Sequence, residues 1–296
     1  MRVFVTGAAG FIGQAVVEDL LKHGHHVLGL ARSDTSAEAV KKAGAEVHRG
    51  DIEDLGSLKA GAQSADGVVH LAFIHDFTDY PRACAVDRAA ITALAEAMTG
   101  TSKPLVIASG TLHLPEEQLQ TENAGAEPGH AFGERAKSED LVRALSKEQD
   151  IRGSVVRLSP TVHGTGDKAF VPMLINFARQ NGFVTMVGDG SNRWPAVHRF
   201  DAAELFRLAV EKGVSGAVYH GVAEQVAVRG ILGTIGKRLQ LPVEVKSVEE
   251  AGALIGFFAH VVGRDNYVSN EKTQKELGWR PKQLGLIADM EGNYFS

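Results

Sequence analysis

The chain has 296 residues and a formal net charge of -5, from 31 lysines and arginines against 36 aspartates and glutamates. This length suits one large domain with a smaller second lobe, and the mildly acidic balance excludes the electrostatic footprint of a protein that binds nucleic acid or an anionic membrane. The single cysteine, Cys84, excludes an internal disulfide, and the opening MRVFVTG lacks the features of a signal peptide, so we expect a cytoplasmic protein.

Short apolar runs alternate with amphipathic patterns through the first 160 residues. Strands are predicted at residues 2–7, 26–31, 45–51, 67–72, 104–109 and 153–159, and helices at residues 11–24, 36–44, 88–98 and 136–149. Strands that are apolar throughout are typical of a parallel sheet covered by helices on both faces. The predicted fold class is therefore α/β, a Rossmann-type doubly wound parallel sheet that binds its ligand at the carboxyl ends of the strands.

Beyond residue 160 the alternation loosens, with more glycine turns and longer gaps between apolar runs. We therefore predict two domains. Residues 1–160 form the doubly wound lobe, and residues 161–296 form a smaller mixed α/β lobe that binds substrate and closes over the cleft. Segments near residues 195–220 are expected to return to the first lobe.

The first predicted strand and helix are joined by VFVTGAAGFIGQAVV, in which Gly7, Gly10 and Gly13 form the pattern G-x-x-G-x-x-G. Glycines at this spacing let backbone N–H groups and the helix N-terminus face a pyrophosphate. The strand before, the helix after and the next strand supply the context that the pattern requires. We therefore predict that residues 1–160 bind NAD(P), with Phe11 and Ile12 also beside the cofactor.

The second predicted strand ends in ARSD, where an NAD-binding protein normally offers Asp or Glu to the ribose hydroxyls. A carboxylate there would repel a 2′-phosphate, whereas Arg32 and the Ser33 hydroxyl would bind it. NADP(H) is therefore the preferred cofactor. NAD(H) is the alternative, if Arg32 lies over the adenine or in solvent and Asp34 takes the ribose.

Two further strand ends are predicted to contact the cofactor. Asp51 and Ile52 follow the third strand, and Leu71 and Ala72 end the fourth. Because the carboxyl ends of parallel strands meet at one edge of the sheet, these residues are expected to line the adenine and its ribose.

The motifs VTGAAGFIG, GDIED, VVHLA, VIASG, VVRLSPTVHGTGD, VGDGSNRWPAVHRFDAAELF and LGWRP follow one another along nearly the whole chain. Together they resemble the extended branch of the short-chain dehydrogenase/reductase superfamily, which includes NAD-dependent epimerases and dehydratases of nucleotide sugars. The resemblance implies hydride transfer between a nicotinamide and a substrate carbon that bears a hydroxyl or a carbonyl. It also implies that a Ser or Thr after the fifth strand hydrogen-bonds the substrate oxygen, a place held here by Ser109 and Thr111, of which either can point inward.

In that family a tyrosine moves the proton, and a lysine one turn further on lowers its pKa and holds the nicotinamide ribose. This chain has no tyrosine on the corresponding helix. Aligning on Lys137 places Gly133 at the tyrosine position. Aligning on Glu139, which often follows the family's lysine by four residues, places Arg135 at the lysine position and Ala131 at the tyrosine position. Arg135 can hold the ribose, but arginine is a poor proton donor at neutral pH.

A replacement acid must then come from elsewhere in the chain. The candidates are His113, His75 with its neighbour Asp76, and His163, because a histidine titrates near pH 6.5. Each histidine has an ordinary alternative as a loop or core-edge residue satisfied by backbone groups. His75 and His163 are also candidates for contact with the substrate.

The stretch after GDG carries an arginine for the substrate diphosphate in the family's nucleotide-sugar enzymes. Here Trp194 stands at that place, and Arg193 precedes it. A Trp ring offers apolar and π surface rather than a phosphate clamp. The sequence therefore favours an uncharged or aromatic small molecule as substrate, although Trp194 can equally be a packing residue between lobes.

Three functions are open on these grounds. The first is an NADP(H)-dependent oxidoreductase for a small carbonyl or alcohol, the second a nucleotide-sugar epimerase or dehydratase, and the third a sensor that binds NADP(H) without chemistry. No metal site is predicted, because His23, His25 and His26 have no carboxylate or thiol at ligand spacing. In relatives the helices at about residues 80–99 and 132–149 form a dimer interface, so a homodimer is possible here.

Overall fold

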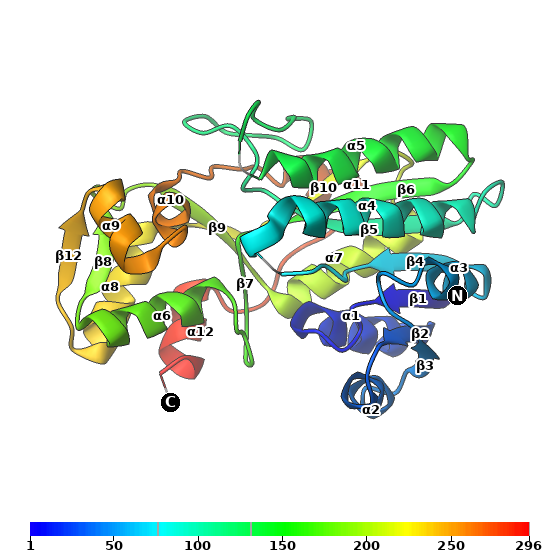
Figure 1. Cartoon of the computed structure of the whole chain (residues 1–296), viewed down its shortest axis with the longest axis horizontal. Helices are drawn as coiled ribbons and strands as arrows, with labels where there is room; N and C mark the ends of the chain where they lie inside the picture. The colour runs from blue at the N-terminus through cyan, green and yellow to red at the C-terminus, as the bar shows by residue number, and fades with distance from the viewer. Residues whose placement is uncertain (76, 131, 296) are drawn as a thin grey trace.

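The computed structural model describes residues 1–75, 77–130 and 132–295 (Figure 1). Two positions discussed above lie outside the described residues: Asp76, a candidate acid, and Ala131, one of the two tyrosine positions. None of the described helices is long and apolar enough to span a membrane.

A seven-stranded parallel sheet forms the centre of the larger lobe, in the order β10-β6-β5-β4-β1-β2-β3. Its strands are β1 (Arg2–Thr6), β2 (His26–Ala31), β3 (Glu46–Arg49), β4 (Gly67–His70), β5 (Pro104–Gly110), β6 (Arg152–Leu158) and β10 (Val218–Gly221). From β1 the chain runs outward through β2 and β3, and then returns to build β4, β5 and β6 on the other side. This reversal creates a crevice between the ends of β1 and β4, and the doubly wound fold class is confirmed.

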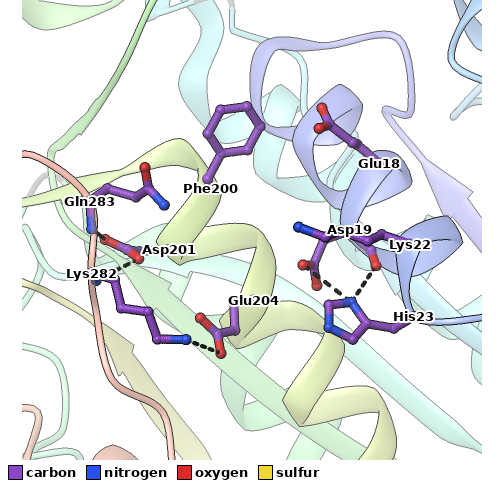
Figure 2. A pocket seen from close by; sticks show the side chains of 9 residues that line it. All are labelled: Glu18, Asp19, Lys22, His23, Phe200, Asp201, Glu204, Lys282 and Gln283. Carbon is purple, nitrogen blue, oxygen red and sulfur yellow. Dashed lines mark hydrogen bonds and ion pairs between the residues drawn. The ribbon is translucent and has the colours of Figure 1, made fainter.

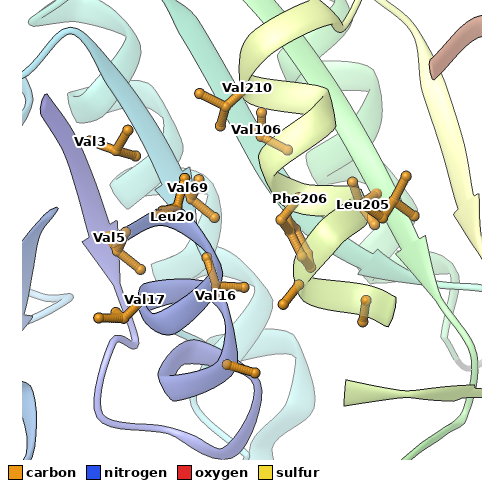
Figure 3. Close-up of a cluster of buried hydrophobic side chains, with 14 of the residues drawn as sticks. Val3, Val5, Val16, Val17, Leu20, Val69, Val106, Leu205, Phe206 and Val210 are labelled. Carbon is orange, nitrogen blue, oxygen red and sulfur yellow. The ribbon is translucent and has the colours of Figure 1, made fainter. Parts of the chain in front are cut away.

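Helices cover both faces of this sheet, as the apolar strands require (Figure 1). One face packs on α1 (Phe11–Lys22), α2 (Asp34–Lys42) and α7 (Arg199–Lys212), and Figure 3 shows Val16, Leu20 and Phe206 meeting the strand valines there. The other face packs on α3 (Leu55–Gln63), α4 (Tyr80–Glu96) and α5 (Gly133–Glu148). A short 3-10 turn, Phe77–Asp79, leads into α4.

The smaller lobe lies beside the carboxyl ends of the central strands and has its own hydrophobic core (Figure 1). It contains a three-stranded sheet, β11-β9-β7, and a two-stranded sheet, β12-β8. Its elements are β7 (Thr161–His163), α6 (Phe170–Asn181), β8 (Val184–Val187), β9 (Arg193–His198), β11 (Glu224–Ala227), α8 (Val228–Leu239), β12 (Val243–Lys246), α9 (Val248–Ile255), α10 (Phe258–Gly263) and α12 (Leu286–Asn293).

The chain passes between the two cores more than once. Helix α7 and strand β10 follow β7 in sequence but belong to the larger lobe, where β10 extends the seven-stranded sheet and α7 packs on its face. Helix α11 (Glu271–Leu277) packs on α7 and β10 and adds Leu277 to the same hydrophobic core. The two-domain division at residue 160 stays a prediction.

Backbone packing at the turn between β1 and α1 admits no side chain at Gly13. A Cβ atom there would lie 2.0 Å from the carbonyl oxygen of Gly7, and a backbone oxygen cannot move aside as a flexible side chain can. The first turn of α1 can therefore lie against the turn that precedes it only because residue 13 is glycine.

We expect Gly13→Ala to lower the free energy of unfolding by roughly 1–3 kcal/mol, because the added methyl group forces the turn and the helix apart. Urea denaturation measures the change. Gly233→Ala in α8 is the matched control, because a Cβ there meets no atom within 4 Å. Equal stability of the two variants would contradict the expectation.

Candidate active site

Two adjoining cavities follow the carboxyl ends of the central strands. The outer cavity has a volume of about 660 Å³ and the inner one about 400 Å³. Both are lined by Gly7, Gly10, Leu71, Phe73 and His75, so they form one continuous cleft. The outer cavity also contains the predicted residues Arg32, Asp51, Ile52 and Ala72. The inner cavity also contains the predicted residues Phe11, Ile12, Gly13, Ser109, Thr111, His113 and Arg135.

The glycine turn has the geometry of a pyrophosphate cradle. Gly7 has φ +69°, and a Cβ atom on it would lie 2.9 Å from the backbone nitrogen of Ala72. The Gly10 N–H donates to the Gly7 carbonyl at 2.9 Å, and Gly10 caps α1, so the first N–H groups of that helix face the cleft. A bare turn beneath a helix N-terminus fits a diphosphate.

Two arginines and three aspartates meet where β2 and β3 end, the aspartates being Asp34, Asp51 and Asp54. Arg32 lines both the outer cavity and a more open neighbouring one, which Arg49 and Ser33 also line. Ser33 caps α2 and exchanges hydrogen bonds with Ser36. The exposed Asp34 carboxylate is ion-paired with Arg49, so its charge is partly neutralised rather than directed at a ribose.

A buried ion pair joins Arg135 of α5 to Asp87 of α4. The Arg135 guanidinium also donates to the Ala108 carbonyl at 2.5 Å, and it lies 4.4 Å from the centroid of the Phe73 ring. Asp87 is fully buried and accepts a further hydrogen bond from the Ser138 hydroxyl at 2.6 Å. Burial alone would raise the pKa of Asp87, but the nearby guanidinium and the His70 hydrogen bond outweigh it and hold that pKa below its usual range.

The tautomer of His70 follows from its neighbours. The Thr6 hydroxyl accepts the N–H groups of Leu71 and Ala72, both at 3.1 Å, so its own proton is donated to Nδ1 of His70 at 2.8 Å. The ring proton is then on Nε2, which faces Asp87 at 3.3 Å. A chain of hydrogen bonds therefore runs from the end of β1 to the cation at the floor of the cleft.

A second buried carboxylate, Glu139, organises the other side of the inner cavity. It accepts hydrogen bonds from the Ser109 hydroxyl at 2.6 Å and from Nη2 of Arg157 at 2.6 Å, and Nε2 of His113 lies 3.4 Å away. Burial would raise the pKa of Glu139, but its hydrogen bonds and ion pair with Arg157 lower it. Burial lowers the pKa of His113 to about 4, so this histidine is neutral at pH 7.

The hydroxyl groups of Ser109 and Thr111, the two candidates for binding the substrate oxygen, each donate a hydrogen bond to another side chain of the protein. Ser109 donates to Glu139, and Thr111 donates to the Asn266 side chain at 2.5 Å, while Asn266 returns a bond to the Thr111 carbonyl at 2.9 Å. Both side chains line the inner cavity.

The arrangement of α5 distinguishes Arg135 from Lys137. Arg135 faces the cleft with 11% of its side chain exposed, whereas the side chain of Lys137 is 60% exposed and ion-paired with Glu134. Of the two alignments of this helix, the one that puts Arg135 at the lysine position therefore agrees with the direction of the side chains.

Aromatic residues that sequence reasoning did not select form much of the inner wall. Tyr80 and Phe132 meet edge to face with centroids 5.8 Å apart, Tyr80 and Phe73 with centroids 6.1 Å apart, and Phe170 lines the same cavity. Tyr80 lies on the face of α4 that carries Asp87, two helical turns away. The seven-residue spacing between Tyr80 and Asp87 is visible in the sequence, and it predicts that both side chains lie on the same face of the helix.

Three predicted substrate contacts lie outside the described lining of the cleft. Trp194 is fully buried in the core of the smaller lobe and donates to the Val261 carbonyl at 3.1 Å. Arg193 forms a two-bond pair with Asp265, at 2.9 and 2.5 Å. Nδ1 of His163 lies 2.8 Å from the Asp289 carboxylate. His75 is the predicted substrate residue that does line the cleft.

A separate charged cavity of about 370 Å³ lies between α1 and α7 (Figure 2). His23 lies 3.5 Å from Asp19, and Lys282 lies 3.5 Å from Glu204. Among the described residues, no group of three or more potential metal ligands was found there or elsewhere.

Removing the negative charge that is paired with Arg135 should lower the stability of the fold. We expect Asp87→Asn to lower stability at pH 7 by roughly 3–5 kcal/mol, because a buried guanidinium is left without its carboxylate. The folded pKa of Asp87 is depressed, so its contribution is present above the unfolded value of about 3.9 and is lost as the pH falls through the folded value. Urea denaturation at pH 7 and at pH 3 should therefore show a larger difference between variant and wild type at pH 7.

Asp140→Asn is the control for this variant, because it breaks an exposed pair with Arg143 on the same helix. Its expected cost is below about 1 kcal/mol. Similar losses in the two variants would show that the buried pair contributes no more than a surface one.

The chain is similar to several known proteins along nearly its whole length. The chain is 46% identical to an uncharacterized protein of Saccharomyces cerevisiae, covering 99% of both chains, and 44% identical to an uncharacterized protein of Schizosaccharomyces pombe, covering 100% of both. It is 26% identical to a 4-hydroxy-2-methyl-3-oxo-4-farnesyl-3,4-dihydroquinoline-1-oxide ketoreductase of Stigmatella aurantiaca, covering 97% of this chain and 95% of that one.

The fold is similar to that of a UDP-glucuronic acid 4-epimerase from Bacillus cereus, with a TM-score of 0.80, 22% identity, and coverage of 99% of this chain and 98% of that one. The family model for NAD dependent epimerase/dehydratase proteins matches residues 3–221. The resemblance to extended short-chain dehydrogenases/reductases is thereby confirmed, and the chain belongs to the NAD-dependent epimerase/dehydratase family of nicotinamide-dependent enzymes.

Proposed function

We propose that the protein is an NADP(H)-dependent oxidoreductase that acts on a small, uncharged carbonyl or alcohol. The observation that carries this proposal is the continuity of the cleft. The glycine cradle opens directly into an inner cavity that combines Ser109, Thr111 and Arg135 with apolar and aromatic walls. In such a cleft a nicotinamide and an apolar substrate can lie side by side.

The residues at the far end of the cleft favour the 2′-phosphate form of the cofactor. Arg32 and Arg49 bring two guanidinium groups to the ends of β2 and β3, at the N-terminus of α2. Asp34 is paired with Arg49, which weakens its repulsion of a phosphate. A bound phosphate would be stabilised there by charge-assisted hydrogen bonds and by the helix N-terminus.

The chain's own residues have distinct roles in this proposal. The turn from Gly7 to Gly13 holds the pyrophosphate, Arg135 holds the nicotinamide ribose, and Ser109 or Thr111 holds the substrate oxygen. A reduced nicotinamide supplies a hydride when bound. The aromatic wall formed by Phe73, Tyr80, Phe132 and Phe170 excludes water from the reacting carbon.

A nucleotide-sugar substrate fits the inner cavity poorly. Arg193 is neutralised by Asp265 and stacks on Tyr267, with the guanidinium carbon 3.7 Å from the ring centroid. Trp194 at the neighbouring position is buried in the core. The ketoreductase relative is named for a quinoline oxide that carries an oxo group and a farnesyl chain, not for a nucleotide sugar. We therefore place the substrate among apolar ketones, and a homodimer through α4 and α5 stays a prediction.

Turnover tests the function directly. The purified protein is mixed with NADPH and a panel of aromatic and alkyl ketones, and cofactor oxidation is followed by the loss of reduced-nicotinamide absorbance. Oxidation that depends on a ketone supports the proposal. Conversion of a nucleotide sugar without net oxidation would make the protein an epimerase, and tight NADPH binding with no turnover would make it a sensor.

Cofactor choice provides a separate prediction. We expect Arg32→Ala to weaken NADPH binding by roughly 10- to 100-fold, because a charge-assisted hydrogen bond contributes about 1.5–3 kcal/mol, and to leave NADH binding nearly unchanged. Calorimetric titration with both cofactors measures this. Lys42→Ala, at the other end of α2, is the control and should alter neither affinity. Equal weakening of NADPH and NADH by the Arg32 variant would count against the 2′-phosphate contact.

A further inference from the structure

We propose that Tyr80 of α4 donates the proton to the substrate oxygen, in place of the tyrosine that α5 lacks. The inference rests on the proposed function. Tyr80 is the first residue of α4 and lines the inner cavity together with Arg135, Ser109 and Thr111. A phenol therefore lines the inner cavity, but its residue belongs to α4 and not to α5.

The other protic groups of the described lining are poor sources of a proton at neutral pH. His113 is already neutral, because burial lowers its pKa to about 4, and burial also lowers the pKa of His75. Arg135 stays charged in its ion pair with Asp87. The Ser109 proton is held by a carboxylate, the Thr111 proton by an amide oxygen and the Ser159 proton by the Gly221 carbonyl, all strong acceptors.

Tyr80 holds its proton differently. Its hydroxyl is hydrogen-bonded to the Cys84 thiol, one turn along α4, and a thiol sulfur is a weak acceptor. Burial raises the pKa of Tyr80, so the phenol keeps its proton throughout the neutral range. That is the form an acid needs for reduction. Cys84, which has no role in the proposed cofactor site, thereby acquires one as the resting acceptor.

The charges around Tyr80 act on its pKa in both directions. Burial and the neighbouring Cys84 raise the pKa of the phenol most, Asp87 raises it further, and Arg135 on α5 is the charge that opposes them and lowers it. The Phe73 ring contacts both residues, with the Arg135 guanidinium carbon 4.4 Å from its centroid and the Tyr80 ring centroid 6.1 Å from it. The ion pair between Asp87 and Arg135 ties α4 to α5, so it fixes the phenol and the cation relative to each other.

In the proposed step Tyr80 protonates the oxygen of a ketone as the ketone is reduced. The carbonyl carbon gains a hydride from the reduced nicotinamide, the carbon–oxygen π bond becomes a lone pair on oxygen, and that oxygen takes the Tyr80 proton. The products are an alcohol, the oxidised cofactor and a phenolate. The phenolate regains a proton from solvent. A developing alkoxide is a stronger base than a phenolate, so the transfer is downhill even with a raised phenol pKa.

The test is Tyr80→Phe, assayed with NADPH and a ketone that the wild-type enzyme reduces. We expect kcat to fall by about 100-fold or more, with the NADPH dissociation constant within about threefold of wild type. Tyr267→Phe is the matched control, because Tyr267 stacks on Arg193 and lies outside the described lining of the cleft. A Tyr80→Phe enzyme that keeps wild-type kcat would overturn the inference and leave the proposed function standing, whereas an inert wild-type enzyme would overturn both.

Two readouts separate a proton donor from a merely structural residue. The kcat of wild type should be flat through the neutral range, and a fall centred near pH 6.5 would transfer the role to a histidine. NMR of ring-labelled tyrosine, with the Tyr80 signal assigned from the variant, should show the phenol pKa falling when the protein is saturated with NADP⁺. An unchanged Tyr80 signal would place the phenol away from the nicotinamide and would overturn the inference without any assay of turnover.

Discussion

The buried ion pair between Asp87 and Arg135 is the contact on which the geometry of the cleft depends. A guanidinium at the floor of an apolar chamber would be too costly without a partner, and Asp87 supplies one from the adjacent helix. His70 and Ser138 also donate to that carboxylate. Arg135 is thus held in one orientation before any ligand binds, which is the preorganisation that a binding site needs.

Helix α5 connects this pair to the rest of the active site. Arg135, Ser138 and Glu139 are spaced by three and four residues, so they share the inward face of the helix. Glu139 reaches Ser109 at the end of β5 and Arg157 in β6, and Arg157 lies 3.4 Å from His220 in β10. Two buried carboxylates therefore fix the ends of four neighbouring strands, which couples the shape of the cleft to the packing of the sheet.

The sequence predicted well those features that depend on neighbouring residues. The glycine turn is flanked by its own strand and helix, so Gly7, Gly10 and Gly13 were identifiable without a structure. Contacts between residues far apart in the sequence could not be predicted in this way. Asn266 meets Thr111 across 155 positions, and Asp265 meets Arg193 from an irregular segment with no periodic pattern. The sequence does not identify Tyr80, because this residue precedes the helix that carries Arg135 by about 50 positions, and it is the packing of α4 against α5 that brings it to the inner cavity.

The distribution of charge along the cleft is the basis for proposing an uncharged substrate. At its outer end Arg32 and Arg49 accompany the predicted phosphate position, whereas in the inner cavity the cation Arg135 already has a buried carboxylate beside it. A second diphosphate would thus meet a cavity with almost no unbalanced positive charge and several aromatic rings. Desolvating such a group without a partner costs more than aromatic contact returns, so the proposed substrate would bind through its apolar surface and through hydrogen bonds to its polar oxygen.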